Sequence, residues 1–231
     1  MTWHKLVAFF VVAALAIPGP GPPLPAPDAP RWPDTPLVRL EALAVMQTLN
    51  AELLASHSAT RTLEEWCDSH RLAAEARIVA QRLSVASPAP SAETLQRLQV
   101  AGSAEVKYRR VQLRCGDRVL SEADNWYVPA RLTPEMNRLL DTTDTPFGRA
   151  VESLQPYRRT FAVTMLWTPL PADWQTARGR QSAAARGRAL AIPQALFEHH
   201  AVLYSAGNQP FAEVAESYQR DLLAFPAPVV R

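Results

Sequence analysis

The stretch EVKYRRVQLRCGDRVLSEADNWYV, from Glu105 to Val128, decides the fold of this 231-residue chain. The runs EVKYRRVQLRC and RVLSEADNWYV flank Gly116-Asp117, a pair that suits a tight chain reversal. The stretch therefore predicts a β-hairpin. A second hairpin is predicted near the C-terminus, where ALFEHHAVLYS and PFAEVAESYQRDLL surround AGNQ.

Helical patterns precede these hairpins and lie between them. Between Leu37 and Leu54, apolar residues recur at steps of three and four, as on one face of a helix. The capping-box spacing of Thr62–Glu65 predicts a second helix, which carries Trp66 and Cys67. Further elements are expected as a strand within Ala76–Val85, helices capped by Ser91, Thr133 and Thr145, and a long strand over Tyr157–Trp167. The order predicts one α+β domain, an antiparallel β-sheet with short helices.

The first 36 residues have a different character. An apolar run, LVAFFVVAALAI, follows Lys5 and is typical of a signal-peptide core, although a buried helix has the same composition. Nine of the next 19 residues are proline, which prevents a helix and favours an extended tether. We therefore expect a signal peptide or N-terminal anchor over 1–17, a Pro-rich linker over 18–36 and the α+β domain over 37–231. The expected location is exported, in the periplasm or cell envelope, with membrane contact only through an uncleaved N-terminal segment.

Composition limits the other function classes. Export would let Cys67 and Cys115 form a disulfide, and two unpaired thiols are the alternative. A net charge of +2 gives no argument for nucleic-acid binding. The motif ARGR occurs twice within Thr168–Ala191, and this segment is expected to be a solvated basic loop.

The adjacent His199 and His200 point to opposite faces of a strand, so they do not chelate one metal together. No metal site and no cofactor is predicted.

Two charged residues lie on predicted strands where the alternation makes them conspicuous. Glu216 shares a face with Val214 and Tyr218, and an acid on an apolar face is costly unless it is paired or protonated. Glu213, on the other face, competes for the same role. Arg110 shares a face with Tyr108, and if that face is inward its planar fork could hold a carboxylate. An outward, solvated Arg110 fits the pattern as well.

The order of four motifs between about Glu105 and Leu223 resembles the chorismate pyruvate-lyase family. The motifs are YRRVQLRCGDRVL, NWYVPARL, TPFGRAV and AGNQPFAEVAESY. The resemblance implies a chorismate lyase-like fold and a reaction that eliminates pyruvate from chorismate to give 4-hydroxybenzoate, without metal or cofactor. The same fold also serves as a ligand-binding module in the effector domains of some bacterial transcription regulators.

The resemblance also implies roles for particular residues. Arg110 corresponds to the arginine that holds a substrate carboxylate, and Glu216 to the glutamate near the substrate's hydroxyl and ether region. Phe147 stands where the family has a pocket-lining leucine, and Gly148 permits close backbone approach. Arg149 or Arg158 is expected as a second cation.

Two hypotheses follow from these residues. The first is a lyase-like enzyme for a small carboxylated ring compound, with Arg110 and Glu216 as its catalytic residues and Phe147, Gly148 and Arg149 at its binding site. The second is a non-catalytic exported module that binds a small aromatic carboxylate or a protein partner. Export favours the second hypothesis, because chorismate is a cytoplasmic metabolite.

Overall fold

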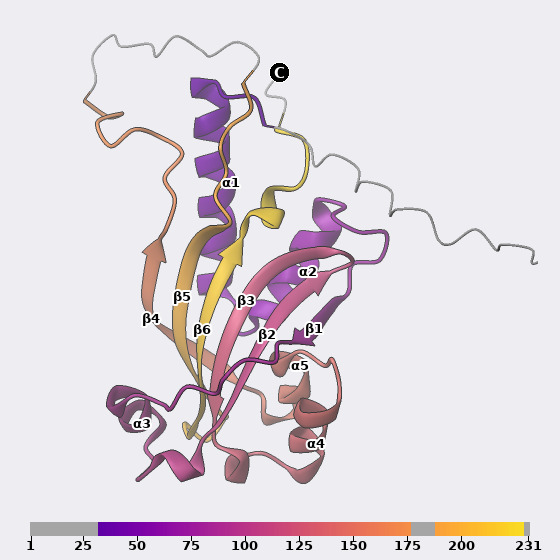
Figure 1. Ribbon diagram of the computed structural model, residues 1–231, viewed down its shortest axis with the longest axis vertical. Coiled ribbons are helices and arrows are strands. Elements are labelled where there is room, and N and C mark those ends of the chain that lie inside the picture. The colour runs from indigo at the N-terminus through magenta and orange to yellow at the C-terminus, as the bar shows by residue number, and fades with distance from the viewer. Residues whose placement is uncertain (1–31, 177–187, 229–231) are drawn as a thin grey trace, which may run out of the picture.

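The computed structural model describes residues 32–176 and 188–228. The predicted leader, most of the Pro-rich linker and the centre of the predicted basic loop lie outside these ranges. A six-stranded sheet, in the order β1-β2-β3-β6-β5-β4, forms the centre of the molecule (Figure 1). All five strand pairs are antiparallel, so the α+β class is confirmed. The strands are β1 Ile78–Arg82, β2 Lys107–Cys115, β3 Arg118–Tyr127, β4 Tyr157–Met165, β5 Ala195–Tyr204 and β6 Pro210–Gln219.

Both predicted hairpins are present, as β2–β3 and β5–β6. In the first, Gly116 has a φ of 55°, in the left-handed region that favours glycine. A β-carbon at this position would lie 3.0 Å from the β-carbon of Ala73, so the turn also packs closely against the segment after α2. The chain therefore reverses at Gly116-Asp117, where the sequence placed the turn, and Cys115 pairs with Arg118 across it.

The α-helices of the described residues are α1 Pro36–Ala55, α2 Ala59–Ser69, α3 Ala92–Leu98, α4 Pro134–Thr142 and α5 Phe147–Ala150. All of them except α3 cover one face of the sheet, here called the inner face, in two groups. Short 3-10 turns lie at Ser103–Glu105, Pro129–Arg131, Glu152–Leu154 and Arg220–Leu223. In Figure 1, α1 and α2 lie behind the sheet, while α4 and α5 lie near its lower end. Each group builds its own hydrophobic core, around Leu49 and Leu63 for the first and around Leu140 and Phe147 for the second.

The helix starts match the sequence at some positions and differ at others. Ser91 and Thr133 cap α3 and α4 as predicted. The prediction that α2 begins near Thr62 was wrong, because Ser58 has extended backbone and its hydroxyl accepts the amide of Arg61. Thr145 does not cap α5 either. Its amide and hydroxyl bind the hydroxyl of Thr143, and Pro146 takes the cap position.

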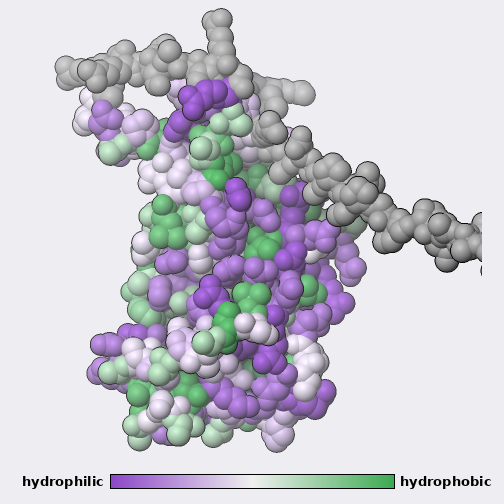
Figure 2. Space-filling view, in the orientation of Figure 1, coloured by the Kyte–Doolittle hydropathy of each residue, from purple (hydrophilic) through white to green (hydrophobic). Residues whose placement is uncertain are grey.

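The other face, here called the outer face, is crossed by α3 and carries many charged and polar residues, among them Arg110, Glu122 and Asp124. Figure 2 views this side, and hydrophilic residues prevail over the sheet. Glu213, 4% exposed, anchors α3 because Arg97 donates to both its carboxylate oxygens, at 2.7 and 2.8 Å, and Thr94 donates at 3.1 Å. Glu213 therefore has a packing role, which leaves Glu216 as the acid on the inner face.

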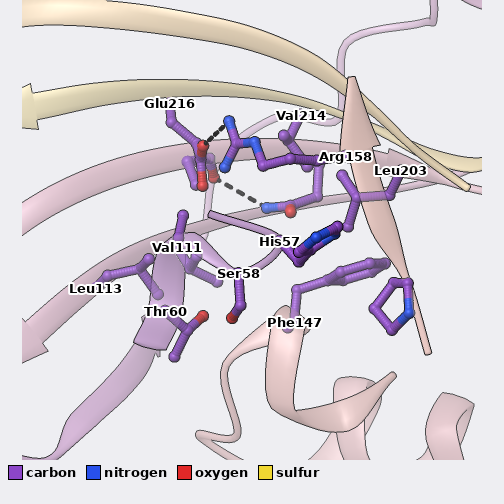
Figure 3. A pocket seen from close by; sticks show the side chains of 15 residues that line it. His57, Ser58, Thr60, Val111, Leu113, Phe147, Arg158, Leu203, Val214 and Glu216 are labelled. Atoms are coloured by element: carbon purple, nitrogen blue, oxygen red, sulfur yellow. Dashed lines mark hydrogen bonds and ion pairs between the residues drawn. The ribbon is translucent and has the colours of Figure 1, made fainter. Parts of the chain in front are cut away.

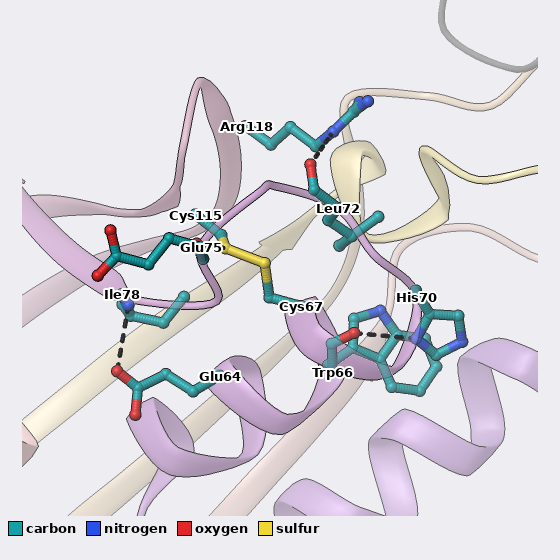
Figure 4. The surroundings of a disulfide bond; sticks show 9 residues. All are labelled: Glu64, Trp66, Cys67, His70, Leu72, Glu75, Ile78, Cys115 and Arg118. Carbon is teal, nitrogen blue, oxygen red and sulfur yellow. Dashed lines mark hydrogen bonds between the residues drawn. A yellow bond between two sulfur atoms is a disulfide. The ribbon is translucent and has the colours of Figure 1, made fainter.

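Two long-range ties close the domain. The indole of Trp32 is buried and donates to the carbonyls of Leu223 and Phe225, so the end of the predicted linker packs against the C-terminal segment. Cys67 of α2 and Cys115 of β2 form a buried disulfide (Figure 4). Among the described helices, none is long and apolar enough to cross a membrane.

We predict that reduction of the Cys67–Cys115 bond lowers the free energy of unfolding by about 4 kcal/mol, because the bond closes a loop with a sequence separation of 48 residues. Urea denaturation with and without a reductant measures this difference. The double variant Cys67→Ala/Cys115→Ala is the control and should not respond to the reductant. Two free thiols in a non-reducing peptide map would contradict the prediction.

Candidate functional site

A cavity lies where the two helical groups meet over the inner face of the sheet (Figure 3). The sheet forms its floor, the turn between α1 and α2 forms one wall, and the start of α5 forms the other. We call this space, of about 50 Å³, the inner cavity. Its lining residues are His57, Ser58, Ala59, Thr60, Val111, Leu113, Ala123, Asn125, Phe147, Gly148, Pro156, Arg158, Leu203, Val214 and Glu216.

A larger space of about 460 Å³, the outer cavity, adjoins the inner one. The two share His57, Ser58, Thr60, Gly148 and Pro156, which form the boundary between them. Charged residues line the outer cavity, and ion pairs Arg61–Glu152 and Arg149–Glu64 join its two walls. The predicted site residue Arg149 therefore lies in the outer cavity, with about half of its side chain exposed.

Phe147 and Gly148 both line the inner cavity. A β-carbon on Gly148 would lie 3.0 Å from Oγ1 of Thr60 and 3.3 Å from Oγ of Ser58. The missing side chain is what lets the start of α5 approach the start of α2. Phe147 is held in place by an edge-to-face contact with Tyr127 and a parallel contact with Phe211.

Arg158 and Glu216 form a buried ion pair at the inner cavity. Their side chains are 5% and 8% exposed, and Nη2 of Arg158 donates to Oε2 of Glu216 at 2.8 Å. Tyr218 donates to the same oxygen at 3.1 Å. Burial alone would lower the pKa of Arg158, but Glu216 and Tyr218 outweigh this and raise it above its ordinary value. Arg158 is therefore a permanent cation inside an otherwise largely apolar space.

Several polar atoms at the inner cavity have no partner within the described ranges. Nε of Arg158 is buried and donates no hydrogen bond. Asn125, 3% exposed, uses its amide nitrogen to bind the carbonyls of Arg109 and Ala123, and its Oδ1 accepts nothing. Oε1 of Glu216 likewise accepts no hydrogen bond there, since Arg158 and Tyr218 both bind Oε2. These three residues thus offer one cationic donor and two acceptor oxygens to the cavity.

The structure does not bring Arg110 together with Glu216. Arg110 lies on the outer face, 37% exposed, and pairs with Glu122 at 3.1 Å and Asp124 at 3.8 Å. The inward arginine of β2 is its neighbour Arg109, which is 3% exposed and donates to the carbonyl of Thr145. Burial lowers the pKa of Arg109 to about 10. Arg110 therefore does not line the inner cavity, and the carboxylate-holding role that the resemblance implies for it does not apply to this cavity.

Sequence reasoning named Arg158 only as one of two options, and it missed Asn125 and the turn residues His57, Ser58 and Thr60. Asn125 had a signal, because it alternates with Ala123 and Tyr127 on the inner face of β3. The turn residues had none, because their place in the cavity depends on how α2 packs against α5.

His199 is buried beside the ion pair, while His200 is partly exposed, as the alternation predicted. Nε2 of His199 lies 2.7 Å from Oδ1 of Asn50, which ties α1 to β5, and its Nδ1 has no partner among the described residues. Burial, with the charge of Arg158 adding to it, lowers the pKa of His199 to about 4. The imidazole is therefore neutral near pH 7.

The fold is an α+β domain in which the sheet and two helical groups surround a cavity that holds one buried ion pair. The chain is 46% identical over 230 residues to the uncharacterized protein y4mC of Sinorhizobium fredii (strain NBRC 101917 / NGR234), covering 99% of this chain and 96% of that protein. The chain therefore belongs to the same family as y4mC. No protein-family model matches it.

Solved structures show weaker likeness. PhnF from Mycobacterium smegmatis aligns with a TM-score of 0.46 and 14% identity, covering 77% of this chain and 70% of PhnF. A GntR-family transcriptional regulator from Enterococcus faecalis V583 aligns with a TM-score of 0.39 and 11% identity, covering 66% of this chain and 99% of the regulator. The chain spans 61% of YydK from Bacillus subtilis subsp. subtilis str. 168, at a TM-score of 0.39 and 15% identity over 67% of this chain. With TM-scores below 0.5, these likenesses carry no argument about what this chain binds.

We predict that Gly148→Ala lowers the free energy of unfolding by about 1–3 kcal/mol, because the new methyl group overpacks the contact with Thr60. Urea denaturation measures the change. Gly102→Ala is the matched control, since a β-carbon there meets nothing within 4 Å and the backbone is extended. Equal effects of the two substitutions would contradict the close approach.

We predict that His199 makes stability fall as the pH drops from about 6.5 towards 4. Its folded pKa of about 4 lies below the ordinary value of 6.5, so in this window the unfolded chain binds the proton and the folded one does not. The full effect is about 3 kcal/mol. Denaturation of the wild type and His199→Gln between pH 4 and 6.5 isolates the contribution of His199 to the free energy of unfolding, because the other titrating groups are common to both proteins. Parallel pH profiles would contradict it.

Proposed function

We propose that this domain binds a small carboxylated compound, with the carboxylate in the inner cavity and the remainder in the outer one. The observation that carries the proposal is the buried guanidinium of Arg158. It has five N–H donors, of which Glu216 takes one, and it faces a space whose other walls are mostly apolar. A carboxylate is the ligand group that an arginine fork binds best.

The sizes of the two cavities support a divided site. The inner cavity, of about 50 Å³, suits a head group rather than a whole ligand. The outer cavity, of about 460 Å³, lies within the range of roughly 300–1,000 Å³ that is usual for small-molecule sites. Phe147, Leu113 and Val214 give the inner cavity an apolar lining around the head group. The proposed ligand is therefore a small acid whose larger part lies in the outer cavity.

A second candidate function is the lyase reaction implied by the motif order. The presence of Glu216 in the cavity beside Arg158 favours it. Elimination of pyruvate from chorismate needs a cation near the developing charge of the departing enolpyruvyl group, which Arg158 could supply. Glu216 has a free oxygen that could orient the substrate hydroxyl. Binding of the ligand does not depend on whether this chemistry is retained.

We also propose that the protein is exported. The Cys67–Cys115 disulfide supports this proposal, because such bonds persist in oxidising compartments and are rare in the cytosol. The apolar run after Lys5 supports it independently. Cell fractionation followed by immunoblotting tests the location, and recovery of the protein in the cytoplasmic fraction would overturn it.

We predict that Arg158→Lys weakens binding of 4-hydroxybenzoate at least about tenfold, because lysine keeps the charge but loses the planar fork. Isothermal titration calorimetry on the purified protein measures the change. Arg110→Lys, an arginine of the outer face, is the matched control and should leave binding unchanged. Equal affinities in both variants would remove Arg158 from the site.

A double variant guards against a folding artefact. Arg158→Met/Glu216→Gln removes both charges together, so neither is left buried and unpaired. It should fold and fail to bind. Incubation of the same wild-type sample with chorismate, followed by assay of 4-hydroxybenzoate and pyruvate, separates binding alone from turnover.

A further inference from the structure

The inner cavity is electrically balanced, which restricts the ligand beyond the presence of a carboxylate. Arg158 and Glu216 are the two residues of opposite charge in its lining, and they neutralise each other. A ligand that is only an anion would bind Arg158 while placing a second negative charge next to Glu216. Like charges at contact oppose binding, so a simple carboxylate fits half of the site and conflicts with the other half.

Two acceptor oxygens without a donor indicate what the ligand must carry besides a carboxylate. Oε1 of Glu216 and Oδ1 of Asn125 are acceptors without a donor in the described ranges. Both residues lie on the cavity floor, where β3 and β6 are neighbours and Glu216 opposes Ala123, two residues from Asn125. Figure 3 shows Arg158 and Glu216 facing each other on one side of the cavity, with Thr60 and Phe147 across from them. An acceptor left without a partner when water is excluded lowers affinity, so the ligand should carry a donor at this point.

We propose that the head group is zwitterionic, with a carboxylate and an ammonium group on the same carbon, as in an amino acid. The carboxylate binds the free donors of Arg158, and the ammonium group binds Oε1 of Glu216 and Oδ1 of Asn125. The two partners are themselves in contact, at 2.8 Å, so a head group that carries both charged groups on one carbon reaches both. This inference rests on the proposed function and narrows it to one ligand class.

The side chain of such a ligand would extend past Ser58 and Gly148 into the outer cavity. The outer cavity therefore selects among amino acids, while the inner cavity selects the head group. A test of the head group must hold the side chain constant, so that the contribution of the outer cavity cancels.

The experiment uses two matched series and the full purified protein at pH 7.5. One series is phenylalanine, 3-phenyllactate, 3-phenylpropionate and phenethylamine. The other is leucine, 2-hydroxy-4-methylpentanoate, 4-methylpentanoate and isopentylamine. Calorimetric titration should give a Kd for the amino acid at least tenfold below those of the acid and the amine in at least one series, with the hydroxy acid between them.

The outcomes separate the two proposals. If the simple acid binds as tightly as the amino acid, the zwitterion inference is wrong and the proposed carboxylate site stands. If the amine binds best, both are wrong. If no member of either series binds, and 4-hydroxybenzoate does, the inference alone is overturned. Binding of none of these compounds overturns the proposed function as well.

Two substitutions with opposite expected effects on the ratio of acid to amino-acid Kd test the two acceptor residues. Glu216→Gln keeps the shape but removes the negative charge, so the ratio of acid to amino-acid Kd should fall from tenfold to about twofold or less. Glu122→Gln, which alters the ion pair of Arg110 on the outer face, is the matched control and should keep the ratio. Asn125→Asp adds a negative charge beside the expected ammonium group and should raise the ratio, even if Glu216→Gln fails to fold. A ratio unchanged in Asn125→Asp would overturn the inference.

Discussion

The buried ion pair between Arg158 and Glu216 is the constraint on which the site depends. Removing two charges from water costs several kcal/mol for each ion, and among the described residues their contact and the hydroxyl of Tyr218 offset this cost. Arg158 comes from the edge strand β4, and Glu216 from β6, with β5 between them. The pair therefore fixes how the three strands are placed, and it brings a cation to the middle of an apolar face.

The helices explain why a cavity remains at this place. α1 and α2 cover one part of the inner face and α4 and α5 another, each with its own core. The groups meet at Gly148, where the absence of a side chain allows contact with Thr60 but leaves the space below it open. The disulfide between Cys67 and Cys115 holds α2 against the sheet on the far side of this contact. The wall of the cavity is thus anchored at both ends of α2.

The site also shows why adjacent residues of one type are hard to assign. Arg109 and Arg110 are neighbours on β2, and a strand sends them to opposite faces. The sequence did not decide which of the two arginines points to the inner face, and the resemblance favoured Arg110. In the structure, Val111 and Leu113 mark the inner face, and Arg109 shares it. The same alternation on β6 places Glu216 on the inner face and Glu213 on the outer face. The sequence favoured Glu216 for the inner face only because its same-face neighbours, Val214 and Tyr218, are largely apolar.

The sequence by itself determined the hairpins, the starts of α3 and α4 and the α+β class, because these follow from local turn chemistry and from the period of the apolar residues. It also brought Phe147, Gly148 and Glu216 forward as candidates, and the structure places all three on the inner cavity. Only the tertiary structure decided that Arg158 is the partner of Glu216, that Asn125 faces the cavity and that Arg110 does not. Those relations depend on strand order and on the meeting of two helical groups. Residues 58 positions apart in the chain, as Arg158 and Glu216 are, carry no local trace of their contact.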